Sequence, residues 1–181
     1  MDLPSRKASL AILSRGLAHN LVSLLSAYAP ALIVVLALAL RLYGINWDQG
    51  NLFHPDELAI LGKVNELRWP SLSNLDVLLD ATESPLNPRW FPYGSLPMYA
   101  GKVVEGAFSP FTDLDYFEFR FVGRGLSALA DAGTVLMVFL LATRLYSRRV
   151  GILASLLTAL AVLHIQLSHF YAVDTLLTLF V

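Results

Sequence analysis

The segment between Arg15 and Arg41 constrains the fold most, because it is a long run without Asp, Glu, Lys or Arg, GLAHNLVSLLSAYAPALIVVLALAL. A bilayer core about 30 Å thick is crossed by about 20 apolar helical residues. The sequence therefore predicts a first transmembrane helix over residues 21–46, preceded by a cytoplasmic N-terminus over residues 1–20.

Further apolar segments predict more membrane-spanning helices. One lies between Arg124 and Arg144 and contains a single acid, Asp131. The last apolar run stops at Val181, too short to cross, so we expect the N-terminal part of a longer multi-span protein, or a truncated chain. The predicted spans after the first are 119–146, 150–167 and the start of a fourth at 172–181.

Composition agrees with a membrane protein. Apolar residues make up 56% of the chain and charged residues 15%, whereas soluble domains carry about 25% charged residues. The net charge of −1 gives no indication of nucleic-acid binding, and the absence of cysteine excludes disulfides and thiol chemistry.

Basic residues indicate the orientation of the predicted spans. They precede the first span and fill the turn between the second and third: Arg6, Lys7, Arg15, Arg144, Arg148 and Arg149. Positive residues of this kind mark the cytoplasmic side. The loop over residues 47–118 then lies on the outer side, as does the turn before Asp174, so Asp56 and Asp174 share one side of the membrane.

The outer loop is expected to carry interfacial helices. In ELAILGKVNELRW, apolar residues recur at near-helical spacing, which predicts an amphipathic helix in the membrane interface. MYAGKVVEGAF, opened by Pro97, predicts a second short surface helix, and Trp47, Trp69 and Trp90 suit headgroup depth. The expected fold class is therefore all-α, a multi-span membrane helical bundle with a long outer loop.

Polar residues along the second predicted span fall on one helical face: Arg120, Arg124, Ser127, Asp131 and Thr134. Charges within spans usually face a bundle interior or a watery cavity. For Asp131 we expect a paired packing group. Arg124 has two open interpretations, because its guanidinium either binds an anion at the outer end or, like that of Arg120, extends to the lipid headgroups.

The acids of the outer side also admit two interpretations. Asp56 and Glu57 suit the start of a helix, where the dipole favours negative charge, and Asp174 suits a helix cap. Alternatively they are catalytic. His54 with this pair lacks a diagnostic metal spacing. The sequence has no phosphate-binding glycine loop, zinc motif or nucleophile elbow, so we predict no cofactor, and a divalent metal has no supporting motif.

These segments together resemble a known family. HPDE after the first span, the proline-rich NPRWFPYGSLPMY, VGRGLSAL with ATRLYSRRVGILASLLTAL, and LHIQLSHFYAVDTLLTLF follow one another over most of residues 30–181. In order and topology they are similar to polyprenyl-phosphate-sugar glycosyltransferases of the membrane GT-C fold. The resemblance is strongest to the group of protein O-mannosyltransferases and lipid A aminoarabinose transferases.

The resemblance implies roles for individual residues. Asp56 corresponds to the acid that activates the acceptor, and Glu57 is its neighbour in the catalytic pair. Arg124 corresponds to the arginine that contacts the donor phosphate, and Asp174 to a second acidic position that holds acceptor or donor. The implied supporting residues are His54, Tyr93 and His169. Because the family has further spans, the 181-residue chain is expected to be inactive alone.

The implied activity is inverting transfer of a sugar from a polyprenyl-phosphate carrier to a hydroxyl of a protein, lipid or glycan. An arginine fork suits the phosphate and a carboxylate suits the acceptor proton. We expect a multi-pass protein of the bacterial inner membrane, from its compact loops, with its active site facing outward, from its basic residues. Two other functions stay open: a transporter of solutes or lipid-linked sugars, and a non-catalytic membrane subunit.

Overall fold

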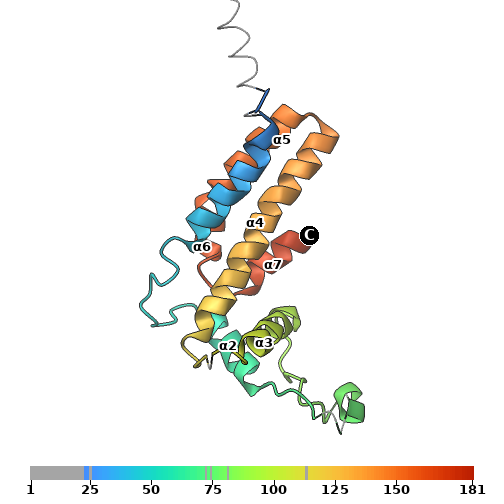
Figure 1. Cartoon of the computed structure of the whole chain (residues 1–181). Helices are drawn as coiled ribbons and strands as arrows, with labels where there is room; N and C mark the ends of the chain where they lie inside the picture. Colours follow the sequence, from blue (N-terminus) through green and yellow to red (C-terminus); the bar gives the residue numbers. More distant parts are fainter. Residues whose placement is uncertain (1–22, 25, 72, 74, 81, 113) are drawn as a thin grey trace, which may run out of the picture.

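The computed structural model describes the chain outside residues 1–22, 25, 72, 74, 81 and 113. The predicted cytoplasmic N-terminus over residues 1–20 lies outside the described residues. The described part contains helices and no strand, so the prediction of an all-α fold is confirmed. It forms a bundle of helices with a smaller group of helices packed across one end (Figure 1).

The bundle is built from the first helix, Ser26–Leu42, and from α4, α5, α6 and α7. Their bounds are Phe119–Leu145 for α4, Arg148–Ala159 for α5, Val162–Leu167 for α6 and Val173–Phe180 for α7. Within the described residues, α4 is the one helix long and apolar enough to cross a membrane, with 27 residues. The first helix is apolar but shorter.

The predicted spans and the observed helices differ in an instructive way. Helix α4 ends within one residue of the predicted 119–146. The predicted single helix over 150–167 is instead two helices, because α5 ends at Ala159 and α6 begins at Val162. The first helix ends at Leu42, and residues 43–50 form turns that lead toward the end group of helices. At both places a backbone carbonyl accepts from an arginine: that of Ile45 from Arg124, and that of Ala159 from Arg41.

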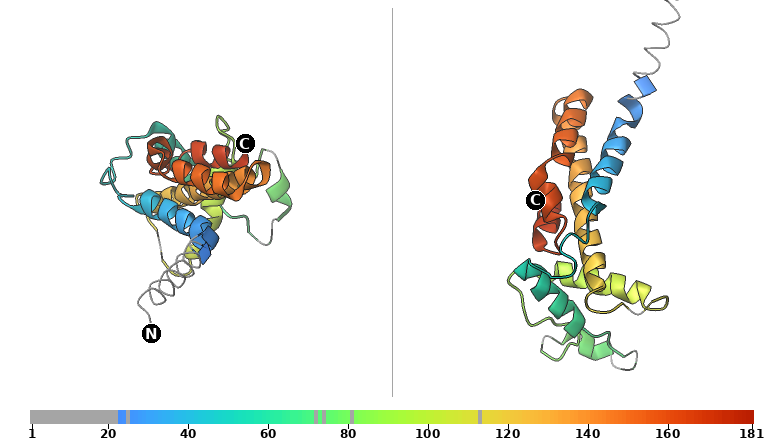
Figure 2. Two further views of the ribbon diagram at one scale, coloured as in Figure 1. Left: turned by 90° about the horizontal axis from the view of Figure 1, so that it is seen from above. Right: turned by 90° about the vertical axis from the view of Figure 1, so that its left-hand side faces the viewer.

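The end group contains α2, Pro55–Glu66, the 3-10 helix η1, Leu75–Leu79, and α3, Leu96–Phe108. It lies at the end of the bundle where α4 begins (Figure 2). Helix α2 starts as its sequence predicts, because proline at the first helical position fixes the entry angle and two acids occupy the first turn. Asp56 and Glu57 therefore both lie in the first turn of α2.

The apolar face of α2 packs against protein, which corrects the expectation that it lies in the membrane interface. Leu61, Val64 and Leu67 are each 1% exposed and form a core with Met98 of α3 and Phe119 of α4. A stripe of this kind is equally suited to lipid and to a protein core. The tertiary arrangement places protein over it, and this core fixes α2 against the start of α4.

Tyr171 fills a gap that only glycine leaves open. Its ring packs against Gly123 of α4, where an added Cβ would lie 2.3 Å from the ring, and its hydroxyl lies against Gly101 of α3. The Tyr171 hydroxyl donates to the carbonyl of Pro97. The turn before α7 is thereby fixed between α3 and α4.

We expect Gly123→Ala to lower the free energy of unfolding by about 1–3 kcal/mol or more, because the new methyl group overlaps the Tyr171 ring. Gly125, on the same helix, has no atom within 4 Å of an added Cβ. Gly125→Ala should therefore be neutral or stabilise by about 0.5–1 kcal/mol, since alanine favours helix. Unfolding in mixed detergent micelles measures both. Equal effects of the two substitutions would contradict the close packing of Tyr171.

Candidate functional site

The site begins with the Asp56 carboxylate, in the first turn of α2. Its Oδ1 accepts a hydrogen bond from the Tyr93 hydroxyl at 3.0 Å, although the two residues are 37 positions apart. This bond and the charge of Asp56 raise the pKa of Tyr93, and the charge of Asp174 acts in the same direction. Asp56 and Tyr93 are therefore in direct contact, and Tyr93 stays a protonated hydrogen-bond donor.

Asp174 lies in the first turn of α7 but does not cap it. The N-cap residue is Ala172, without a side-chain cap, so the interpretation of Asp174 as a cap does not hold. Its carboxylate has no hydrogen-bond partner among the residues that the structure describes. The helix dipole favours negative charge at this position. Asp174 is therefore available to a ligand.

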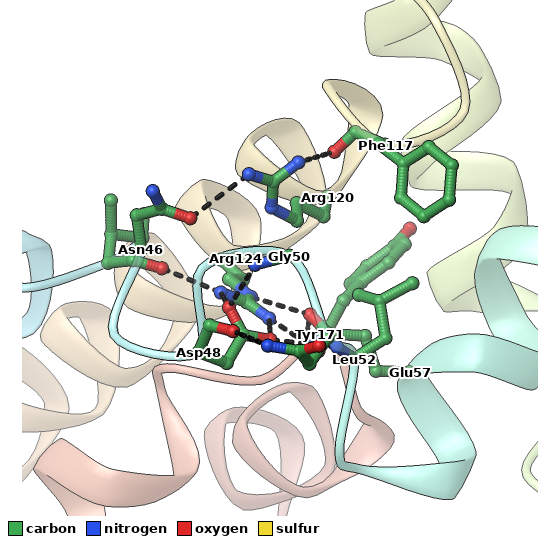
Figure 3. Close-up of polar contacts among 11 residues, drawn as sticks. Asn46, Asp48, Gly50, Leu52, Glu57, Phe117, Arg120, Arg124 and Tyr171 are labelled. Atoms are coloured by element: carbon green, nitrogen blue, oxygen red, sulfur yellow. Dashed lines mark hydrogen bonds and ion pairs between the residues drawn. The ribbon is translucent and has the colours of Figure 1, made fainter.

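The buried side chain of Arg124 connects α4 with α2 and with the segment after the first helix (Figure 3). Arg124 of α4 binds Glu57 of α2 with Nε–Oε1 2.7 Å and Nη2–Oε2 2.8 Å. It also binds Asp48 with Nη2–Oδ2 2.6 Å and Nη1–Oδ1 3.0 Å, and the carbonyl of Ile45 at 2.7 Å. All three charged side chains are 0% exposed. We call Asp48, Glu57 and Arg124 the arginine clamp.

The clamp changes the role expected for Arg124. A guanidinium has five N–H donors, and here each of them has an acceptor in Glu57, Asp48 or Ile45. In this arrangement Arg124 has no N–H free for a donor phosphate. The expectation that Arg124 contacts the phosphate is therefore corrected: Arg124 holds α2 and residues 45–48 against α4.

Asp48 is anchored as firmly as Arg124. Its hydrogen bonds with Arg124 lower its pKa to about 2, against the opposing effect of burial. The backbone N–H groups of Gly50 and Leu52 donate to the same carboxylate and act in the same direction. The segment after the first helix is thereby wrapped around one carboxylate, which stays ionised at neutral pH.

Glu57 and Asp56 are neighbours with opposite environments. Successive residues of a helix point about 100° apart, so Glu57 faces the clamp while Asp56 faces Tyr93. Glu57 is 0% exposed and also accepts the Tyr171 N–H at 3.0 Å. Its oxygens are already used, so we assign Glu57 a positioning role. Of the two acids, Asp56 is the one available for chemistry.

The histidines expected to support the site lie at its edge. His54 is the N-cap residue of α2, without a side-chain cap bond, and its ring stacks on Phe170 with centroids 4.6 Å apart. The ring nitrogens of His169 lie 2.6 Å from the carbonyl of Ile165 and 2.8 Å from that of Tyr43. His169 therefore joins α6 to the end of the first helix, and both ring nitrogens contact backbone carbonyls.

A second buried network lies deeper in the bundle. Asp131 of α4 accepts from Arg41 Nε at 2.5 Å, and its other oxygen lies 2.6 Å from His164 Nδ1. Arg41 Nη1 also donates to the carbonyls of Ala37 and Ala159, each at 3.1 Å. The carbonyl of Ala159 belongs to the end of α5, so Arg41 stabilises the interruption between α5 and α6. The expectation that Asp131 is a paired packing group is confirmed.

We expect Asp131→Asn to lower the free energy of unfolding by about 3–5 kcal/mol, because Arg41 would be left buried without a counter-charge. Thr134→Val, one turn along the same face, removes only a hydrogen bond to Ala130 and should cost about 1 kcal/mol. Titration of both variants with denaturing detergent measures the difference. A cost for Asp131→Asn no larger than that of Thr134→Val would contradict an important ion pair.

An open apolar groove of about 420 Å³ lies beside these elements. Its lining comes from the end of the first helix, from α6 and from the turn after it: Tyr43, Gly44, Trp47, Val162, Ile165, Gln166, His169 and Phe170. Asp56 and Asp174 do not line it. Phe170 connects the groove with the site, because the same ring stacks on His54, two residues before Asp56.

Within the described part of the chain, no group of three or more His, Asp or Glu side chains is placed to hold a metal ion. The Tyr93 hydroxyl binds Asp56, and the buried acids Asp48 and Glu57 are both paired with Arg124. The chemistry available at the site is therefore that of a free carboxylate, a phenol and a second carboxylate.

Sequence reasoning missed two contributors to the site. Asp48 was assigned no role from the sequence, although an acid two residues before glycine, as in WDQG, is a signal for a side chain that binds its own turn. Tyr171 carried no signal, because its role depends on glycines that are far away in sequence. Arg41 was interpreted only as a boundary of the first span.

Comparisons with known proteins give no assignment: no protein-family model matches the chain, and no curated protein and no solved structure matches it.

Proposed function

We propose that the protein is a membrane glycosyltransferase that moves a sugar from a polyprenyl-phosphate carrier to a hydroxyl acceptor on the non-cytoplasmic side. The observation that carries the proposal is the environment of Asp56. A buried clamp fixes the start of α2, and Asp56 accepts a hydrogen bond from Tyr93, whose pKa the charge of Asp174 also raises. A carboxylate held in this way is suited to accept a proton.

The chemistry requires one base and one leaving group. The Tyr93 hydroxyl occupies Oδ1 of Asp56, which leaves Oδ2 for the acceptor hydroxyl. As the acceptor oxygen bonds to the anomeric carbon, its proton passes to Asp56. The bond from that carbon to the phosphate oxygen breaks, and the phosphate leaves with the electron pair. Attack from the face opposite the phosphate inverts the anomeric centre, by analogy with one-step inverting glycosidases.

A membrane location belongs to this proposal. Helix α4 has the length for a span, and the interrupted pair α5 and α6 packs beside it together with the first helix (Figure 1). We propose that these helices form part of a multi-span bundle. The apolar groove lined by Ile165 and Phe170 would accept a hydrocarbon chain, and its connection to His54 would bring the chain close to Asp56.

Transport is the second candidate, and one observation favours it. Transporters often place charged side chains beside interrupted helices near the middle of the membrane. The Arg41, Asp131 and His164 network lies against the interruption between α5 and α6. This network, however, is paired, with Arg41 and Asp131 buried, whereas Asp56 lies in α2 of the end group and Asp174 in the first turn of α7. A non-catalytic subunit remains the third candidate, in which the end group would bind a partner protein.

Incubation of the full-length protein in lipid vesicles with labelled polyprenyl-phosphate sugars tests the proposal. The expected result is a labelled acceptor whose formation requires Asp56. Movement of intact carrier across the vesicle membrane without a labelled acceptor would establish transport instead. For a non-catalytic subunit, substitution of the acids Asp56 and Glu57 would weaken assembly with a partner protein. The assembled wild-type complex would transfer no sugar.

A further inference from the structure

Three buried arginines lie in the described part of the chain: Arg41, Arg120 and Arg124. Arg41 has a carboxylate oxygen at 2.5 Å and Arg124 has one at 2.6 Å. Arg120 is 9% exposed, yet no carboxylate of a described residue lies within 4.0 Å of it. It is therefore the buried arginine without a bonded counter-charge.

The partners of Arg120 are all neutral (Figure 3). Nη2 donates to Asn46 Oδ1 at 3.0 Å, Nη1 donates to the carbonyl of Phe117, and the guanidinium lies over the Phe121 ring at 4.1 Å. Nε is buried and has no acceptor among the residues described. Two of the five N–H donors of this guanidinium are used, so Nε and one N–H on each terminal nitrogen have no acceptor among the described residues.

Charge balance alone does not account for Arg120. The arginine clamp carries two carboxylates against one guanidinium, and a second cation one helical turn away offsets part of that excess. Offsetting a charge at a distance, however, supplies no acceptor for an N–H group. Buried N–H groups of a charged side chain without acceptors cost free energy. An oxygen-rich anion would supply both the charge and the acceptors.

The surroundings of Arg120 allow an anion to approach. Asn46 and Phe117, which flank the guanidinium, are both exposed. Gly50, at φ +90°, lies beside it without a side chain; an added Cβ would be in van der Waals contact with the guanidinium carbon, at 3.7 Å. The start of α4 adds partial positive charge from its dipole. Asn46 uses its carboxamide oxygen for Arg120, which leaves its NH₂ group as a further donor.

We propose that Arg120, with Asn46, binds the phosphate group of a membrane lipid. Arginine donors arranged as a planar fork match phosphate oxygens. The inference deepens the proposed function, and it rests on that function only if the lipid is the polyprenyl carrier. In that case Arg120 binds the donor phosphate, because all five N–H groups of Arg124 are already used. A phospholipid headgroup offers the same phosphate chemistry, so the experiment separates the two sources.

The test uses the full-length protein in neutral detergent micelles and native mass spectrometry. Farnesyl phosphate, farnesol and dioleoyl phosphatidylglycerol are titrated against the wild type, Arg120→Gln and Arg144→Gln. Arg144 is the matched control, an exposed arginine at the other end of α4. We expect Arg120→Gln to weaken farnesyl phosphate binding about tenfold or more, with farnesol unchanged and Arg144→Gln like the wild type.

The other outcomes are equally decisive. If Arg120→Gln loses binding of phosphatidylglycerol but keeps binding of farnesyl phosphate, the phosphate site is supported and is assigned to a phospholipid headgroup. Unchanged binding of both phosphates by a less stable Arg120→Gln would overturn the inference and leave Arg120 as a charge that balances the clamp. If Arg120→Gln does not fold, Arg120→Lys keeps the charge but not the fork. Weakened farnesyl phosphate binding by Arg120→Lys would support the site, and binding at wild-type affinity would overturn it.

The same preparations distinguish this inference from the proposed function. Wild-type protein that transfers no sugar while Arg120→Gln loses phosphate binding would refute the glycosyltransferase and retain the site. Protein that transfers sugar through Asp56 while Arg120→Gln binds both phosphates normally would retain the glycosyltransferase and refute the site.

Discussion

Replacing Asp56 by asparagine should lower the rate of sugar transfer by about 10²–10⁴-fold, the usual contribution of a general base. Asparagine keeps the shape of the side chain and an oxygen that can accept from Tyr93, whose hydroxyl now donates to Asp56 at 3.0 Å. It does not accept a proton from the acceptor hydroxyl. The fold should persist, because Asp56 is not part of the buried clamp.

The measurement is initial-rate transfer of labelled sugar by full-length protein in vesicles, normalised to the amount inserted. Glu66→Gln is the matched control on α2, because Glu66 is exposed and pairs only with Lys63. Its rate should equal that of the wild type. Transfer by Asp56→Asn at the wild-type rate would remove Asp56 from the mechanism and, with it, the main support for the proposed function.

Replacing Arg124 by methionine should lower the free energy of unfolding by about 3–5 kcal/mol, because two carboxylates that are 0% exposed would lose their shared cation. The loss should also reduce transfer, since α2 and the segment around Asp48 would no longer be held against α4. Arg124→Lys should restore little, because an ammonium has three donors and lacks the planar fork that binds both acids.

A triple variant separates the cost of leaving the two acids unpaired from the cost of losing the arginine clamp as a whole. In Asp48→Asn, Glu57→Gln, Arg124→Met none of the three clamp positions carries a charge, so the free energy of unfolding should recover in part toward that of the wild type. Detergent-denaturation curves of the single and triple variants provide the measurement. A triple variant less stable than Arg124→Met would show that the acids contribute to stability independently of the arginine.

Much of the fold follows from local pattern. The charge-free segments predict helices, and the predicted bounds of α4 agree with the structure within one residue. The spacing of polar residues correctly placed Arg124 and Asp131 on the buried face of that helix. The interruption between α5 and α6 was not predicted, because the carbonyl of Ala159 that it frees is satisfied by Arg41, 118 residues away.

The candidate site was predicted in part. The topology expected from basic residues places Asp56 and Asp174 on one side of the membrane, and this stays a prediction; the structure shows the contact of Asp56 with Tyr93. The role of Arg124 was misassigned, because its partner Asp48 lies 76 positions earlier in the chain. Sequence spacing does not reveal a pairing of that kind.

By itself the sequence determined that this protein is helical, where α4 runs and which residues share its polar face, because these follow from local helical periodicity. Only the tertiary structure decided that the apolar stripe of α2 is covered by protein, that Arg124 is saturated and that Arg120 keeps free donors. The reason is physical: an arginine has the same donors wherever it stands, and what it binds depends on which acceptors the fold brings within about 3 Å.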